Sequence, residues 1–255
     1  MPSSLAQCEA LTSSNPDWPS ALVAALSPPA SPRCAPPPAA GLLREADVSE
    51  VVPRVLLASS LVGLDAPRLR SLAVHTLVNV VSADEQAPLD DEGLATSGIE
   101  ACCCLNMDGA WRPGYERRIR SAADALAEAV GEGRVGLVHG GPTSASRAAA
   151  VVLCYLMLHH RAAAAGGSTG GGADSGEAAA GVPLAAAGVP LADALVLLRA
   201  AWPHAWPRRA YLRWLHELDV EQRGVPSVPL AMLELAEEPE EVGGGEVARV
   251  GGAGQ

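Results

Sequence analysis

The sequence predicts an α/β domain in which a mostly parallel central sheet is flanked by helices. Short apolar runs alternate along the chain with segments whose apolar residues recur at helical spacing. The apolar runs are hydrophobic nearly throughout, which is typical of parallel strands that are buried on both faces. The chain has 255 residues, enough for one such domain with long flanking segments.

Four apolar runs predict the strands. They are VVPRVLLAS (51–59), HTLVNVV (75–81), IEACCCLNM (99–107) and RVGLVH (134–139). Between the first two runs, residues 66–74 predict one or two helical turns. Before the third run, SADEQAPLDDEG (82–93) predicts a polar loop.

Four longer segments predict helices. The first, 114–130, places its apolar residues on one helical face, at Tyr115, Ile119, Ala122, Leu126 and Val130. The second, 145–161, is almost wholly apolar and predicts a buried helix. The last two, 189–203 and 211–220, follow a low-complexity segment, and Pro203 ends the earlier of them.

Three segments have the composition of disordered chain. Residues 1–46 contain nine of the 21 prolines, 162–188 has an excess of Gly and Ser, and 223–255 is acidic and rich in glycine. Residues 47–222 are then predicted to form one domain, interrupted by the low-complexity insert at 162–188.

The charge balance excludes two classes of partner. All 18 cationic residues are Arg, and 29 acidic residues bring the net charge to −11. Nucleic-acid binding and polybasic membrane binding both need an excess of cations, so we expect neither partner. No apolar run reaches the length of roughly 18 residues that a membrane span requires.

The six cysteines indicate a reducing compartment. None forms a C-x-x-C pair, and Cys102, Cys103 and Cys104 are consecutive, which suits neither a disulfide framework nor a metal site. We expect reduced thiols in a protein of the cytoplasm or nucleus, with no metal ion. The three consecutive cysteines and Cys154 are interpreted as packed core thiols.

The segment GLVHGGPTSASRAAAVVLCYLM (136–157) carries the sharpest local signal. A strand runs into a tight loop of Gly, Thr and Ser, and the loop runs into the buried helix. Such a loop directs backbone N–H groups and the positive end of the helix toward one point, where an anion can bind. Arg147 would add a guanidinium suited to phosphate. The alternative is a tight connection that binds nothing, because glycine loops precede many helices.

The order of the segments resembles that of the dual-specificity, cysteine-dependent phosphatases, which have a protein tyrosine phosphatase-like fold. LVHGGPTSASR resembles their signature, in which a histidine and a cysteine are separated from an arginine by five residues. Further segments resemble other parts of that domain in the same order, namely VVPRVLLASS, LRSLAVHTLVNVV, CLNMDGAW and LADALVLLRAAWPHAWPRRAYLRWL. The resemblance covers residues 48–161 and 189–220.

The resemblance implies a phosphate site and needs no cofactor. Arg147 matches the arginine that holds the phosphate, and Asp108 matches the general acid of the family. The loop that would surround the phosphate contributes Gly141, Thr143, Ser144, Ala145 and Ser146.

The nucleophile of the family is missing. His139 matches the histidine before the cysteine, but the loop from there to Arg147 is one residue longer than in the family. The cysteine position falls on Gly140 when counted from His139 and on Gly141 when counted back from Arg147. Ala148 also replaces the hydroxyl that follows the arginine. Because the thiolate forms the covalent bond to phosphorus, we expect no catalysis.

The expected function follows from this resemblance. The Ser/Thr/Tyr-interacting pseudophosphatases also have glycine after the histidine, so we expect an inactive protein that binds phosphorylated or signalling proteins. Two alternatives stay open: a weakly active protein tyrosine/serine/threonine phosphatase with a displaced nucleophile, and an α/β scaffold that binds no phosphate.

A basic patch lies just before and at the start of the predicted helix 114–130. It consists of Arg112, Arg117, Arg118 and Arg120. This patch is either an ordinary solvated helix face or a docking surface for an acidic or phosphorylated partner.

Overall fold

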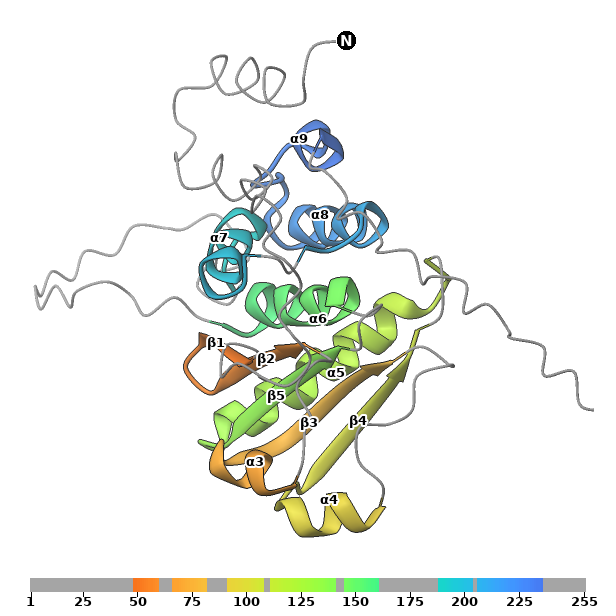
Figure 1. Cartoon of the computed structure of the whole chain (residues 1–255). Helices are drawn as coiled ribbons and strands as arrows, with labels where there is room; N and C mark the ends of the chain where they lie inside the picture. The colour runs from red at the N-terminus through yellow and green to blue at the C-terminus, as the bar shows by residue number, and fades with distance from the viewer. Residues whose placement is uncertain are drawn as a thin grey trace, which may run out of the picture.

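The fold is built on one five-stranded sheet with the strand order β1-β2-β5-β3-β4 (Figure 1). The computed structural model describes residues 48–59, 66–81, 91–107, 111–140, 145–160, 188–203 and 206–235. The strands are β1 (Val48–Val52), β2 (Val55–Ser59), β3 (Val74–Val81), β4 (Ala101–Asn106) and β5 (Val135–Gly140). β1 is antiparallel to β2, and every other pair is parallel. The predicted α/β class with a mostly parallel sheet is therefore confirmed.

The first predicted strand is two strands. The run 51–59 was expected to form one strand, but β1 and β2 form a hairpin that turns at Pro53 and Arg54. Arg54 has a φ of 69°, and its N–H donates to Glu50 Oε1 at 2.9 Å. The turn reverses the chain because Pro53 cannot donate to a strand ladder and Arg54 adopts the left-handed conformation.

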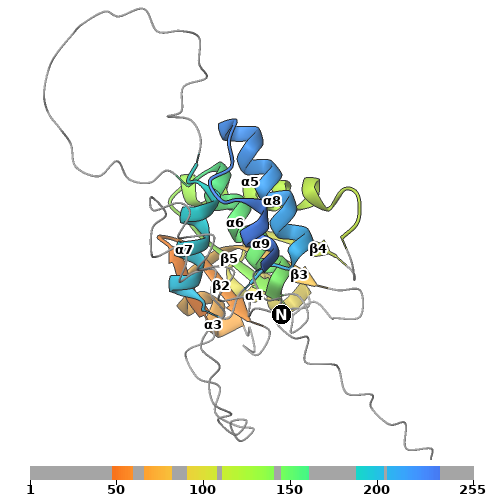
Figure 2. The ribbon, with the colours of Figure 1, turned by 90° about the horizontal axis from the view of Figure 1, so that it is seen from above.

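Helices cover both faces of the sheet (Figures 1 and 2). They are α3 (Ala66–Ser71), α4 (Asp91–Ser97), α5 (Tyr115–Gly131), α6 (Ala145–Leu158), α7 (Leu191–Ala201), α8 (Arg209–Arg223) and α9 (Leu230–Leu235). α3 and α4 lie on one face, and α5 and α6 lie on the other. α7 and α8 pack on the outer side of α6, and α9 packs on α8. Within the described ranges, no helix is both long and apolar enough to cross a membrane.

The polar loop predicted at 82–93 ends in a short helix. α4 begins at Asp91, inside that predicted loop, and its Leu94 packs against the apolar cluster around Leu69 and Leu77. Arg70 of α3 donates through Nη1 to the Thr96 carbonyl oxygen at 2.5 Å. The packing of Leu94 and the hydrogen bond from the Arg70 side chain thus stabilise a helix that the composition of its segment did not predict.

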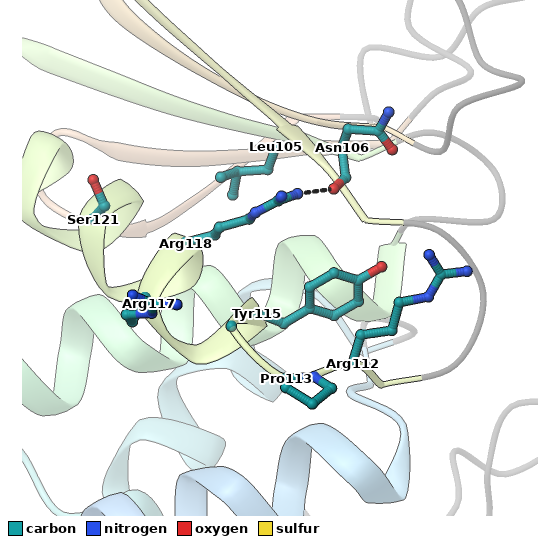
Figure 3. Close-up of a pocket in the computed structure, with 9 residues that line it drawn as sticks. Leu105, Asn106, Arg112, Pro113, Tyr115, Arg117, Arg118 and Ser121 are labelled. Atoms are coloured by element: carbon teal, nitrogen blue, oxygen red, sulfur yellow. Dashed lines mark hydrogen bonds between the residues drawn. The ribbon is translucent and has the colours of Figure 1, made fainter.

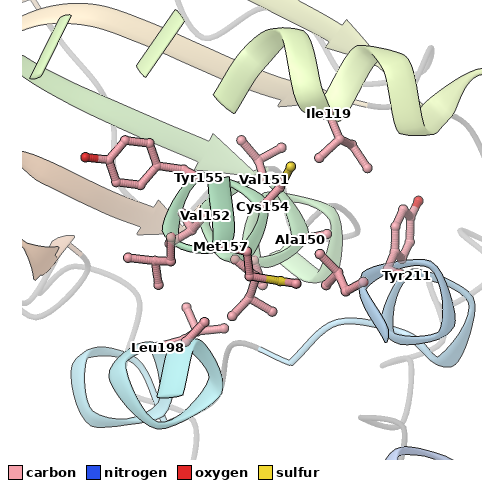
Figure 4. Close-up of a cluster of buried hydrophobic side chains, with 14 of the residues drawn as sticks. Ile119, Ala150, Val151, Val152, Cys154, Tyr155, Met157, Leu198 and Tyr211 are labelled. Carbon is pink, nitrogen blue, oxygen red and sulfur yellow. The ribbon is translucent and has the colours of Figure 1, made fainter. Parts of the chain in front are cut away.

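Helix α6 is the centre of the main core. Its residues from Ser146 to Met157 are all buried, and its side chains point toward α5, α7 and α8 (Figure 4). Ile119, Leu198 and Tyr211 meet it from those three helices. A helix that is covered on all sides needs apolar residues on all sides, which explains why this segment lacks an amphipathic period.

The chain returns from the predicted insert directly onto α6. Gly188, the last residue of that insert, lies so close to the end of α6 that a Cβ would be 2.4 Å from the Met157 carbonyl oxygen. The next residue, Val189, donates its N–H to the Leu156 carbonyl oxygen at 3.1 Å. Only glycine permits this close backbone approach. The rest of the insert, 162–187, lies outside the described residues.

The packed chain extends past the predicted domain end at 222. The carboxylate of Asp219 is fully buried and accepts from Leu191 N–H at 3.2 Å, Ser227 N–H at 2.5 Å and Arg223 Nε at 3.0 Å. Val228 and two side chains of α9 are buried as well. Residues 223–235, predicted to begin the C-terminal tail, therefore pack with the domain because Asp219 fixes the chain that leads into α9. The predicted N-terminal segment, 1–46, and the remainder of the predicted C-terminal tail, 236–255, lie outside the described residues.

Candidate functional site

The carboxyl ends of four parallel strands define one edge of the sheet. β2, β5, β3 and β4 run in the same direction and end at Ser59, Gly140, Val81 and Asn106. In open α/β sheets, ligands bind outside the carboxyl ends of the strands. Five residues beyond the end of β5, α6 begins, so its amino-terminal end also faces this edge.

Arg147 lies in the first turn of α6 and is almost completely buried. Its exposed fraction is 3%, an unusual value for a guanidinium. The neighbouring Ser146 is also buried, and its hydroxyl oxygen accepts the Arg208 N–H at 2.8 Å. This contact ties the start of α6 to the segment that leads into α8. The arginine is therefore held on rigid structure next to the strand ends.

Tyr211 of α8 lies beside Arg147. Burial raises the pKa of the Tyr211 phenol, and the positive charge of Arg147 acts in the opposite direction. The Tyr211 ring is 5.1 Å from the Trp111 ring, which in turn is 6.1 Å from Tyr115 and 5.7 Å from Trp214. Tyr211 therefore links the buried guanidinium to a cluster of four aromatic rings. The sequence placed Tyr115 on the apolar face of its helix, but only the folded chain brings the four rings together.

A second buried polar pair lies on β5 and β3. His139 and Asn79 are adjacent in register, and His139 Nδ1 lies 3.1 Å from Asn79 Oδ1. An amide oxygen can only accept, so Nδ1 carries the proton in this contact. The pair fixes the His139 ring one residue before the end of β5. Asn79 was not recognised in the sequence, although a polar residue with two apolar residues on either side of it is a signal for such a contact.

The structure describes only part of the predicted site. Gly140, at the end of β5, and the α6 residues Ala145, Ser146 and Arg147 lie at the same edge of the sheet. Four other predicted site residues lie outside the described residues, namely Asp108, Gly141, Thr143 and Ser144. β4 ends at Asn106 at this edge, two residues before Asp108 in the sequence.

The consecutive cysteines are not all core residues. Cys102 and Cys104 are exposed and Cys103 is half-buried, so the interpretation of packed core thiols is wrong for the two exposed residues. β4 is the edge strand next to β3, and the side chains of Cys102 and Cys104, which lie on the same face of it, are exposed. Partial burial and the neighbouring Cys104 raise the pKa of Cys102 to about 12. Such a thiol is almost entirely protonated at neutral pH and is a poor nucleophile.

Cys154 is buried inside α6, as predicted. Burial raises the pKa of its thiol to about 12. Among the described residues, no group of three or more His, Cys, Asp or Glu side chains is placed to hold a metal ion.

These features define a protein tyrosine phosphatase-like α/β domain, with a buried arginine at the start of the helix that follows the central strand. Solved structures identify the fold more closely. The chain is 21% identical to human DUSP28, with a TM-score of 0.50, over 69% of this chain and 94% of that one. It is 19% identical to a mouse protein described as a dual specificity phosphatase complexed with zinc tungstate, with a TM-score of 0.50, over 74% of this chain and 98% of that one.

The chain therefore has the fold of the dual-specificity phosphatases, as its sequence resemblance predicted. No protein-family model matches the sequence, and no curated protein matches it either. At these identities the likeness defines the fold alone, and the activity has to be argued from the residues of this chain.

Proposed function

We propose that the protein is a catalytically inactive member of the dual-specificity phosphatases that binds phosphorylated proteins. One observation carries this proposal: the site has Arg147 but has glycine, at Gly140 and Gly141, where the family has its cysteine. The arginine is buried at the start of α6, and glycine occupies both possible nucleophile positions. The site keeps a group that binds phosphate and lacks the group that attacks it.

Arginine is well suited to hold a phosphate without reacting. Its planar guanidinium donates two parallel hydrogen bonds to phosphate oxygens, and it stays charged at physiological pH. The amino-terminal end of α6 adds the favourable potential of a helix of 14 residues. Binding of this kind needs no cofactor or metal ion.

The absence of a thiol removes the covalent step. The sequence from Gly140 to Arg147 contains no cysteine, and its Thr143, Ser144 and Ser146 carry hydroxyls that need a base to become nucleophiles. Ser146 already accepts a hydrogen bond from the backbone at Arg208. The partner would be a phosphorylated or signalling protein of the cytoplasm or nucleus.

Calorimetric titration with tungstate and with a phosphotyrosine peptide tests the binding. We expect Arg147→Lys, which keeps the charge but loses the planar fork, to weaken binding of both by about tenfold, equivalent to about 1.4 kcal/mol. Arg213→Gln is the matched control, because Arg213 is an exposed arginine of α8 that pairs with Glu234. Equal binding by wild type and Arg147→Lys would show that Arg147 does not hold the phosphate, and no binding by a folded wild type would leave only a scaffold. Either result would refute the proposal.

A phosphatase assay tests the missing nucleophile. We expect no turnover of p-nitrophenyl phosphate by the wild type. Gly140→Cys and Gly141→Cys each place a thiol at one of the two candidate positions, and turnover by either variant identifies the position that faces Arg147. Turnover by the wild type that disappears in Arg147→Lys would show a displaced nucleophile and overturn the assignment as inactive.

A further inference from the structure

A cavity of about 720 Å³ opens between the end of β4 and the start of α5 (Figure 3). Leu105 and Asn106 of β4 form one side, and the first turns of α5 form the other. Three arginines line this cavity, namely Arg112, Arg117 and Arg118. Arg112 comes from the segment before α5, whereas the other two come from the helix itself. We call this cavity the basic pocket.

The arginines of the basic pocket differ in how they are held. Arg118 donates through Nη1 to the Asn106 carbonyl oxygen at 2.7 Å and lies over the Tyr115 ring, 6.0 Å from its centre. Arg112 and Arg117 are exposed, and neither pairs with an acidic side chain of the described residues. None of the described residues that line the pocket is acidic. Two guanidinium groups therefore remain available to a ligand, beside a third that is fixed.

The geometry favours several carboxylates over one enclosed phosphate. The Gly114 N–H at the amino-terminal end of α5 already donates to the Glu116 carboxylate, at 3.0 Å to Oε2 and 3.1 Å to Oε1. This N–H therefore cannot contribute to a backbone cradle for phosphate. What remains is an open cavity with guanidinium groups on separate side chains, each of which can hold one carboxylate.

Charge complementarity identifies the occupant. The protein as a whole carries a net charge of −11, so a site for anions has to be concentrated locally. We propose that the basic pocket docks an acidic segment of a partner protein, with Glu or Asp side chains on Arg112 and Arg117. This docking does not depend on phosphate binding at Arg147, although both sites face the same edge of the sheet.

Fluorescence anisotropy with a labelled hexaglutamate peptide tests the docking. We expect the peptide to bind the wild type at low salt and to bind Arg112→Gln/Arg117→Gln about tenfold more weakly, as for two exposed ion pairs. Arg120→Gln is the matched control, because Arg120 is also on α5 but pairs with Glu221 and does not line the pocket. A hexaserine peptide should not bind, and added salt should weaken hexaglutamate binding.

The outcomes separate this proposal from the proposed function. Equal hexaglutamate binding by the wild type and the double variant, or equal weakening by Arg120→Gln, would overturn the docking site. Binding to phosphatidylserine vesicles through these arginines, without binding to hexaglutamate, would assign the pocket to a membrane surface and also overturn it. If hexaglutamate binds as expected but tungstate does not bind, the docking site stands and the phosphate site fails.

Discussion

Helix α6 and strand β4 are both apolar and both carry cysteines, yet their surroundings differ. α6 is covered by the sheet and by three helices, and its Cys154 is completely buried. β4 is the outermost strand next to β3, and its Cys102 and Cys104 are exposed. The comparison shows that an apolar run in the sequence predicts a helix or a strand. Whether the side chains of that helix or strand are buried depends on the elements that pack against it.

The largest expected difference between the two elements is in stability. Leu153 of α6 is fully buried, so we expect Leu153→Ala to lower the free energy of unfolding by about 2–5 kcal/mol. Cys104→Ala in β4 removes an exposed side chain and should change it by less than about 0.5 kcal/mol. Urea unfolding followed by circular dichroism measures both values. Similar losses in the two variants would mean that β4 is covered as well as α6.

The alkaline stability of the protein should depend on Cys154. Burial raises the pKa of this thiol from 9.0 to about 12, so between these pH values the unfolded chain loses the proton while the folded protein keeps it. The unfolded state then binds fewer protons, and stability falls as pH rises, by up to about 1.4 kcal/mol per pH unit.

The variant Cys154→Ala isolates this effect. We expect a flatter decline in the free energy of unfolding between pH 9 and pH 10.5 than in the wild type. Leu153→Ala is the control, since it should lower stability by the same amount at both pH values. An unchanged decline in Cys154→Ala would show that the thiol is not protected from ionisation.

A small effect is also expected for an ion pair at the outer edge of the sheet. Arg134, just before β5, forms an ion pair with Glu100, just before β4, and the Glu100 side chain is 57% exposed. Because solvent screens such a pair, Glu100→Gln should cost about 0–1 kcal/mol, and less at high salt. Glu221→Gln removes another exposed pair, with Arg120, and serves as the control in the same urea titrations. A loss above about 2 kcal/mol at Glu100 alone would mean that this pair holds the edge strand in place.

Much of the fold could be predicted because periodicity and composition are local properties. The helices α5, α6, α7 and α8 and the strands β3 and β5 lie where their patterns predicted them. The hairpin of β1 and β2 was missed because the sequence 51–59 reads as one apolar run through Pro53. α9 was missed because its segment is short and is stabilised through the distant Asp219 network.

The candidate site could be predicted in part. The sequence alone located Arg147 at a helix start and showed glycine at both nucleophile positions. It did not indicate the contact between Asn79 and His139, which are 60 residues apart, or the edge-to-face contact between the Trp111 and Tyr211 rings. The basic patch was recognised from Arg112, Arg117 and Arg118, but not that these three share a cavity while Arg120 pairs elsewhere.

The sequence by itself determined the α/β class, most of the elements and the absence of a thiol between Gly140 and Arg147. These properties depend on residue type and on spacing along the chain, which the sequence states directly. Only the tertiary structure decided that β4 is an edge strand, that Asp219 is buried among its partners and that Arg147 is covered. The physical reason is that burial and charge pairing depend on neighbours in space, which come from distant parts of the chain.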